Sequence, residues 1–120
     1  LTTAAQQRGA AGCVTDGLVR DVRQIREMGF SVFCGGISPL DSRGRGKMMT
    51  RDTPIECAGV RVASGDYVFA DVDGIVVIPA VALGQTIAKA LEKVTGEDAT
   101  RDALRAGESL QSVFGRLGIL

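Results

Sequence analysis

The sequence predicts an α/β fold, in which short strands alternate with helices. An apolar run over residues 11–14 precedes the turn signal Asp16-Gly17, and apolar residues then recur at helical spacing over residues 22–28. A compact β-prone run over residues 30–34 follows and ends at Gly35-Gly36. A strand, a helix and a second strand in immediate succession are typical of an α/β sheet.

Length and composition indicate one globular domain over residues 1–120. The chain is 45% hydrophobic and 23% charged, and its formal net charge is zero. A neutral chain gives no support for a nucleic-acid partner, which needs a clustered basic face. No apolar stretch approaches the roughly 18 residues of a membrane helix, and there is no signal-like start. We therefore expect a cytoplasmic protein that binds neither nucleic acid nor a membrane.

Histidine is absent from the chain, which narrows the possible chemistry. A Ser-His-Asp or Cys-His pair is excluded within the chain, and a typical zinc site is disfavoured. The three cysteines, Cys13, Cys34 and Cys57, lie apart in strand-like runs and are expected to be reduced, buried thiols. A protein-bound metal would need oxygen ligands, which favours Mg²⁺ or Mn²⁺ held by few carboxylates and several waters.

The remaining elements of the first half follow from helix and loop signals. Residues 1–8 are rich in Ala and Gln and predict a helix that stops at Gly9, and the second helix stops at Gly29. Residues 37–54 form a loop that contains Arg43, Arg45, Lys47 and Arg51. This loop is either an anion-binding or interface loop or a solvated excursion, and its mixed charge favours the latter.

The second half begins with strands and ends with helices. Residues 55–58 and 60–62 predict two β segments with a bulge or bend at Gly59. Residues 63–66 form a tight turn, and strands over residues 67–70 and 75–78 are joined by a hairpin-type turn. In that turn, Asp71 and Asp73 are explained better by turn chemistry than by metal binding.

A helical tail extends from about residue 80 to residue 120. One apolar stripe runs from Leu83 to Val94, and the helical pattern continues to Gly107, with Gly96-Glu97-Asp98 near its middle or at a break. Ser109 is a candidate cap for a final helix that ends at residues 118–120. A long amphipathic tail often packs on a neighbouring subunit, so we expect an oligomer.

Arg20 and Asp21 are the candidate site residues, because they lie between a predicted strand and a predicted helix. Open α/β sheets bind ligands at that position, and a helix N-terminus favours anions. The carboxylate can hold a metal ion and the guanidinium can hold an oxyanion. The alternative is structural: Asp21 is a favoured helix N-cap, and Arg20 is then simply solvated.

Several segments in combination resemble one family, the 4-hydroxy-4-methyl-2-oxoglutarate aldolases, which also contains the regulator of ribonuclease E activity A. They are GCVTDGLVRD, CAGVRVASGDYVFADVDGIVVIP and KVTGEDATRDALRAGESLQSVFGRLGIL. The resemblance implies an α/β/β/α sandwich related to swivelling phosphotransfer domains. It implies a homotrimer or a dimer of trimers with active sites between subunits. The family's glycine-rich segment would precede Leu1, so the N-terminal part of the fold is expected to be missing.

The resemblance also assigns residues and chemistry. It implies Mg²⁺ or Mn²⁺ held by Asp21, a pyruvyl unit contacted by Arg20, and metal-bound water held by Glu97 of a neighbouring subunit. The implied activity is that of a lyase cleaving a C–C bond in a 2-oxo acid, as an aldolase, an oxaloacetate decarboxylase or both. A divalent cation and a guanidinium suit this chemistry, because both offset the charge of a pyruvate enolate.

A non-catalytic regulator that acts by protein–protein contact is the competing reading, and a structural subunit is a third. In the regulator branch the residue after the arginine is typically not aspartate, so Asp21 favours the metal-dependent branch. Gln24 departs from the aldolase pattern, which has an acidic residue there. The expected substrate is a small 2-oxo acid.

Overall fold

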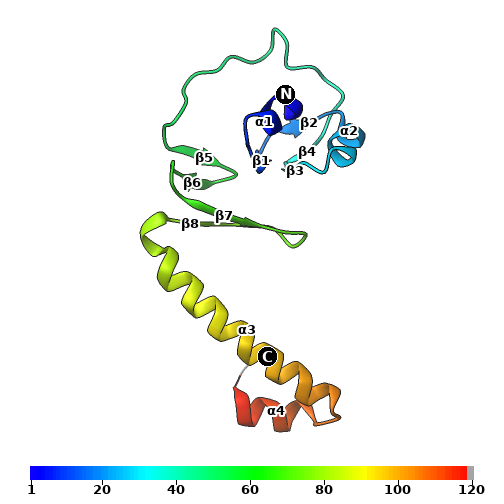
Figure 1. Ribbon diagram of the computed structural model, residues 1–120, viewed down its shortest axis with the longest axis vertical. Helices are drawn as coiled ribbons and strands as arrows, with labels where there is room; N and C mark the ends of the chain where they lie inside the picture. The colour runs from blue at the N-terminus through cyan, green and yellow to red at the C-terminus, as the bar shows by residue number, and fades with distance from the viewer. Residues whose placement is uncertain (119–120) are drawn as a thin grey trace. The chain divides into compact units, whose positions relative to one another are not determined.

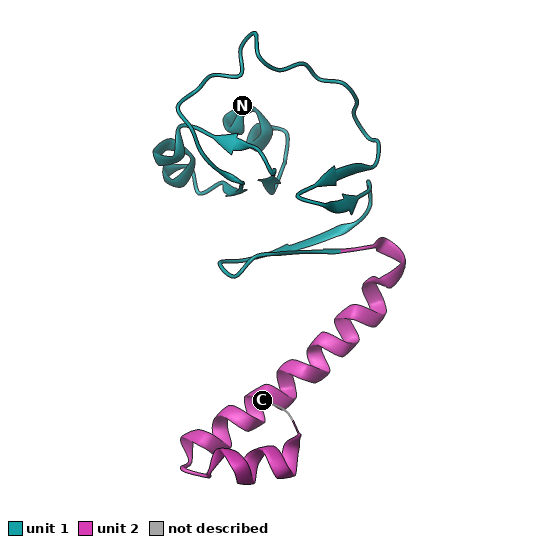
Figure 2. Cartoon of the chain, turned by 180° about the vertical axis from the view of Figure 1, so that it is seen from behind, with its two compact units in different colours: residues 1–77 teal, residues 78–120 magenta. Residues whose placement is uncertain are grey.

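The computed structural model describes residues 1–118 and contains two compact units, residues 1–77 and residues 78–120 (Figures 1 and 2). The helices are α1 (Thr2–Gln7), α2 (Val22–Glu27), α3 (Leu83–Arg105) and α4 (Leu110–Leu117), with a 3₁₀ turn, η1 (Ala80–Ala82). The strands are β1 (Gly12–Val14), β2 (Leu18–Val19), β3 (Ser31–Phe33), β4 (Gly36–Ile37), β5 (Ile55–Cys57), β6 (Val60–Val62), β7 (Tyr67–Ala70) and β8 (Ile75–Ile78). None of the helices in residues 1–118 is both long and apolar enough to cross a bilayer.

The predicted strand–helix–strand succession is confirmed in the first unit. Strand β1 pairs in parallel with β3, and β2 pairs in parallel with β4, so helix α2 is the crossover for both pairs. The helix buries Ile25, and Phe30 is buried directly before β3. These two side chains anchor α2 to the strands and place its N-terminus beside the end of β2. The α/β class is therefore confirmed, while the four-layer sandwich stays a prediction.

The turn that links β1 to β2 is held from two directions. The Gly35 N–H donates to the Gly17 carbonyl oxygen at 2.9 Å, and a Cβ atom on Gly35 would overlap the Asp16 carbonyl oxygen. The Asp16 carboxylate accepts a hydrogen bond from the Ala58 N–H at 3.1 Å. The sequence predicts Asp16 as a residue that shapes this turn. Asp16 also ties that turn to residues far along the chain.

Strands β5 and β6 are the two predicted β segments, and they form an antiparallel hairpin, so the chain makes a tight turn at Gly59 and not a bulge. Ile55 lies opposite Val62 and Cys57 opposite Val60. The two residues between the strands, Ala58 and Gly59, have φ values of 50° and 80°. Positive φ at both central residues is the signature of a type I′ turn, whose twist suits a two-residue hairpin. The Asp16 contact helps to offset the cost of this conformation at Ala58.

The hairpin-type turn predicted between β7 and β8 is confirmed, because these strands form a two-stranded sheet. The Asp71 N–H donates to the Gly74 carbonyl oxygen at 3.0 Å, and the Asp73 N–H donates to Asp71 Oδ1 at 2.8 Å. The two aspartates therefore serve the turn. In residues 1–118 every sheet has two strands, so each strand is paired along one edge.

The prediction that the cysteines are buried is wrong for Cys13 and Cys34, which are exposed, and Cys57 is half-buried. Two-stranded sheets cover little of one another, so strand residues stay accessible. All three residues of β1 are exposed.

The second unit is a helical hairpin. Helix α3 runs unbroken through Gly96, so the sequence segment 96–98 lies within the helix and not at a break. The predicted cap of α4 is confirmed, since Ser109 Oγ accepts from the Ser112 N–H at 3.2 Å. Arg116 binds both carboxylate oxygens of Glu108, at 2.8 and 2.9 Å. The predicted end of the tail at residues 119–120 lies outside the described residues.

Val113 is the packing centre of this hairpin, and its truncation is expected to destabilise it. Its side chain is fully buried where α4 packs on α3. Val113→Ala removes buried methyl groups and leaves a cavity, so we expect a loss of about 2 kcal/mol in unfolding free energy. Circular dichroism during thermal unfolding measures it. Val81→Ala is the matched control because Val81 is fully exposed, and equal effects of the two variants would contradict the assignment.

Candidate functional site

Arg20 and Asp21 lie where the sequence predicts, between the end of β2 and the first residue of α2. Both line a pocket of about 480 Å³ in the first unit, within the size range of small-molecule sites. The walls combine apolar and charged side chains. Among them are Cys13, Leu18, Ile25, Asp41 and Arg43. The strand-to-helix junction thus opens into a cavity with carboxylate and guanidinium groups on its wall.

The backbone of Asp21 is in the left-handed region, with φ 61° and ψ 31°. An N-cap residue normally has extended geometry and accepts a hydrogen bond with its side chain. Asp21 does neither: within the described residues its side chain makes no cap bond to α2, and only its carbonyl oxygen engages the helix, through the Ile25 N–H at 3.1 Å. Asp21 therefore occupies the N-cap position of α2, as the structural alternative has it, but its carboxylate does not cap the helix. Left-handed non-glycine residues cluster at functional sites, and aspartate tolerates this conformation better than most.

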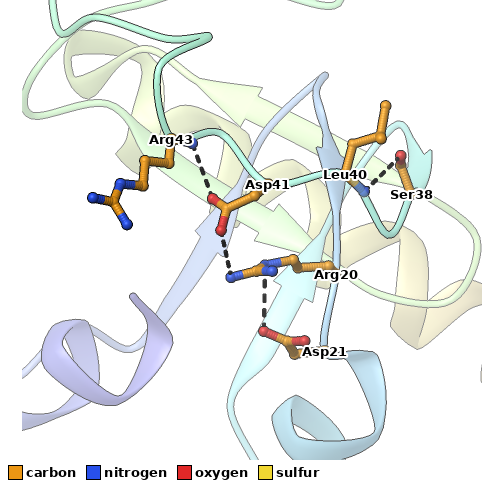
Figure 3. A network of polar contacts seen from close by, with 6 residues as sticks. All are labelled: Arg20, Asp21, Ser38, Leu40, Asp41 and Arg43. Atoms are coloured by element: carbon orange, nitrogen blue, oxygen red, sulfur yellow. Dashed lines mark hydrogen bonds and ion pairs between the residues drawn. The ribbon is translucent and has the colours of Figure 1, made fainter.

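Arg20 is paired, and so it is not simply solvated. Its Nε lies 3.6 Å from Asp21 Oδ2, and its Nη2 lies 3.2 Å from Asp41 Oδ2 (Figure 3). The three side chains are about half exposed, at 48%, 60% and 54% for Arg20, Asp21 and Asp41. They are open enough to receive a ligand from solvent. The guanidinium therefore stands between two carboxylates on the pocket wall.

Asp41 is the site residue that the sequence did not predict. It lies in the long loop after β4, and its Oδ1 accepts a hydrogen bond from the Arg43 N–H at 2.9 Å. This bond, together with the Arg20 charge, holds the pKa of the Asp41 carboxyl below its ordinary value of 3.8. The carboxylate therefore stays ionised to a lower pH than an ordinary aspartate. Asp-Ser-Arg-Gly is a turn signal in the sequence, but turn chemistry gives no sign of a partner 21 residues earlier.

The basic residues of this loop fall in different places. Arg43 lines the same pocket as Arg20. Arg45 lines a neighbouring pocket of about 320 Å³, and its Nη1 donates to the Asp41 carbonyl oxygen at 3.4 Å. Lys47 and Arg51 are exposed. Arg43 and Arg45, in the first part of the loop, therefore lie at the pockets. Lys47 and Arg51, in the second part, are solvated, as the alternative for this loop predicted.

Glu97, the third predicted site residue, lies on α3 in the second unit. Its carboxylate pairs with Lys93 Nζ at 3.4 Å, and one third of its side chain is exposed. The predicted role of Glu97 concerns a neighbouring subunit and stays a prediction. The pairing with Lys93 keeps the carboxylate on the surface of α3.

The donor set at the pocket suits a hard cation with few protein ligands. Within residues 1–118 no three His, Cys, Asp or Glu side chains are grouped to bind a metal together. Asp21 offers a half-exposed carboxylate that makes no helix-cap bond. Mg²⁺ is commonly held by one or two carboxylates while it retains several waters. The residues present therefore fit such an ion and do not fit zinc.

Comparison with known proteins places the chain in a family. The RraA-like family model, described as Aldolase/RraA, matches residues 1–77. Over 111 residues the chain is 32% identical to Protein DlpA of Legionella pneumophila, covering 92% of this chain and 18% of that protein. Over 100 residues it is 34% identical to a protein of Halalkalibacterium halodurans provisionally named 4-hydroxy-4-methyl-2-oxoglutarate aldolase, covering 83% of this chain and 47% of that protein.

A solved structure has the same fold. The crystal structure of an uncharacterized protein from Pseudomonas syringae matches with a TM-score of 0.88 at 23% identity, covering 93% of this chain and 56% of that one. This chain spans about half the length of the aldolase-named relative. The family match over residues 1–77 includes the complete Arg20–Asp21–Asp41 cluster. The chain belongs to the RraA-like family, Aldolase/RraA.

Proposed function

We propose that this chain forms part of a divalent-metal-dependent lyase that cleaves a C–C bond in a small 2-oxo acid and releases pyruvate. The observation that carries the proposal is the conformation of Asp21. Its left-handed backbone withholds the carboxylate from α2 and leaves it on the pocket wall beside Arg20. The name of the H. halodurans relative supports the same class of reaction.

The reaction fits the groups at the pocket. In aldol cleavage the 4-hydroxyl group loses its proton and becomes a carbonyl as the C3–C4 bond breaks. The electron pair of that bond moves into the C2–C3 bond, and negative charge develops on the 2-oxo oxygen. Oxaloacetate decarboxylation releases CO₂ and gives the same enolate. Arg20 is placed to stabilise that oxygen or the neighbouring carboxylate, because its planar fork suits both. Protonation at C3 then yields pyruvate.

Asp21 is the proposed ligand of Mg²⁺ or Mn²⁺. When bound, the cation supplies Lewis-acid stabilisation of the developing negative charge. Because the chain has no histidine, water at the site is the proposed carrier of protons. Glu97 of a neighbouring copy is proposed to hold that water, in a cytoplasmic homotrimer or dimer of trimers. The basis for proposing this assembly is the long helical tail, which we expect to pack on a neighbouring copy.

Pyruvate release tests the proposal. Oxaloacetate and 4-hydroxy-4-methyl-2-oxoglutarate are offered separately with Mg²⁺ or Mn²⁺, and pyruvate is followed by NADH oxidation with lactate dehydrogenase. We expect turnover with either metal and none with excess EDTA. Spontaneous decarboxylation of oxaloacetate by the metal alone is the blank. The assay is repeated on a longer polypeptide that includes this chain. Absence of turnover in both would refute the lyase and favour the protein-binding regulator.

A further inference from the structure

We propose that Asp41 is a positioning residue for Arg20: its carboxylate holds one guanidinium nitrogen, so that another stays free for the anionic group of a substrate. This inference deepens the proposed function and rests on it. It concerns a loop residue that neither the sequence pattern nor the relatives' names point to. The contacts that carry it all lie within the first unit, around the 480 Å³ pocket.

The guanidinium of Arg20 forms ion pairs at two of its three nitrogens. Asp21 Oδ2 lies 3.6 Å from Nε, and Asp41 Oδ2 lies 3.2 Å from Nη2. Because the group is planar and rigid, two anchors on different nitrogens restrict its plane as well as its position. Among the described residues no hydrogen bond or ion pair occupies Nη1. Nη1 is therefore the nitrogen left for a carboxylate or an enolate oxygen.

Asp41 is itself oriented, which lets it act as an anchor. Its Oδ1 accepts from the Arg43 N–H at 2.9 Å, while its Oδ2 faces Arg20. One carboxylate oxygen thus accepts a hydrogen bond from the loop backbone, and the other forms the ion pair with the guanidinium. The Arg45 side chain adds a bond to the Asp41 carbonyl oxygen at 3.4 Å. The same two contacts, the Arg43 N–H and the Arg20 charge, lower the pKa of the Asp41 carboxyl.

A role in stability alone does not explain the pair. Both side chains are about half exposed, and ion pairs of this kind contribute little to folding. If Asp41 acted only through its charge, its removal would change anion binding in a different direction than a positioning role predicts. An extra negative charge at the pocket should repel an anionic ligand, so its removal should strengthen binding. A positioning role predicts the opposite sign, because an unanchored Arg20 loses its preorganised geometry.

The affinity for oxalate tells whether removal of the Asp41 charge strengthens or weakens anion binding. Oxalate is a planar dianion that mimics the enolate of pyruvate, and its dissociation constant is measured by calorimetry in the presence of Mg²⁺. The test variant is Asp41→Asn, which removes the charge but keeps an oxygen for the Arg43 N–H. We expect binding to weaken by about threefold or more, the size of an exposed ion-pair effect, and kcat for pyruvate release to fall as well.

Asp52→Asn is the matched control. Asp52 lies in the same loop, is exposed, and also has a positive φ, at 52°. Its replacement changes the net charge equally, so it reports the general electrostatic effect. We expect unchanged or slightly tighter oxalate binding and unchanged kcat. Oxalate binding in Asp41→Asn that is as tight as in the wild type, or tighter, would overturn the positioning role.

A second readout does not depend on ligand. The Nε–H resonance of Arg20 in a ¹⁵N-labelled sample reports how firmly the guanidinium is held. Asp41→Asn is expected to shift this resonance or broaden it by faster exchange, whereas Asp52→Asn leaves it in place. If wild-type protein neither binds oxalate nor releases pyruvate, the lyase proposal fails, and this resonance still decides whether Asp41 holds Arg20. An Arg20 signal that is identical in Asp41→Asn would refute the inference.

Discussion

Asp21→Asn is expected to abolish metal-dependent release of pyruvate, with kcat/KM falling by at least about 10²- to 10³-fold. Asparagine has nearly the shape of aspartate and also tolerates the left-handed backbone. The variant therefore keeps the fold and removes the negative charge proposed to hold the cation. It also removes the ion pair of Asp21 with Arg20 Nε. Steady-state assays across a range of Mg²⁺ concentrations measure the loss.

The metal itself provides an independent check on Asp21. Paramagnetic Mn²⁺ binding is followed by electron spin resonance of the free ion, and Asp21→Asn is expected to raise the dissociation constant. Asp52→Asn again serves as control, because it makes the same chemical change at another exposed left-handed aspartate. If Mn²⁺ affinity and turnover survive in Asp21→Asn, then Asp21 is not the metal ligand and the central assignment is wrong.

Arg20→Lys is the second change with a large expected effect, a fall in kcat/KM of about 10²-fold. Lysine keeps the positive charge but replaces the planar fork by a single ammonium group. One ammonium cannot hold Asp41, face Asp21 and present a further fixed donor to an enolate oxygen in the same way. We expect the loss mainly in kcat, because the enolate charge develops only as the bond breaks.

Arg23→Lys is the matched control for this variant. Arg23 is exposed on α2, three residues further along the chain, and carries the same chemical change. Full activity is expected for Arg23→Lys, with a wild-type circular dichroism spectrum for both proteins. Wild-type kinetics in Arg20→Lys would show that charge alone suffices at this position and would contradict the role of the fork.

Local sequence patterns predicted the helices, strands and turns well, because the formation of each such element depends mainly on residues close together in the sequence. The apolar spacing of Val22, Ile25 and Met28 predicted α2, and the Asp-Gly pairs and Ser109 predicted turns and a cap that the structure contains. Gly59 was harder, because a bulge and a two-residue hairpin turn share the same glycine signal. The positive φ of Ala58 makes this connection a hairpin turn and not a bulge, and an alanine in the sequence does not predict positive φ.

The sequence predicted only the part of the site that is formed by residues adjacent in the chain. Arg20 and Asp21 are adjacent, and their place between a strand and a helix follows from the pattern around them. The Asp41 contact depends on how the loop after β4 returns to the pocket. The exposure of Cys13 and Cys34 likewise depends on how many strands each sheet contains. Both are properties of tertiary structure that no local window encodes.

The two-stranded sheets leave strand edges open, and this affects how readily the chain associates with other copies of itself. Within residues 1–118, each strand leaves one row of backbone donors and acceptors without a sheet partner. Strands β7 and β8 also carry exposed Val68, Phe69 and Val76. Apolar, weakly charged strands with open edges are templates for strand addition and fibrillar self-assembly. Asp71 and Asp73 add two negative charges at the tip of that hairpin, and we expect these charges to oppose such growth.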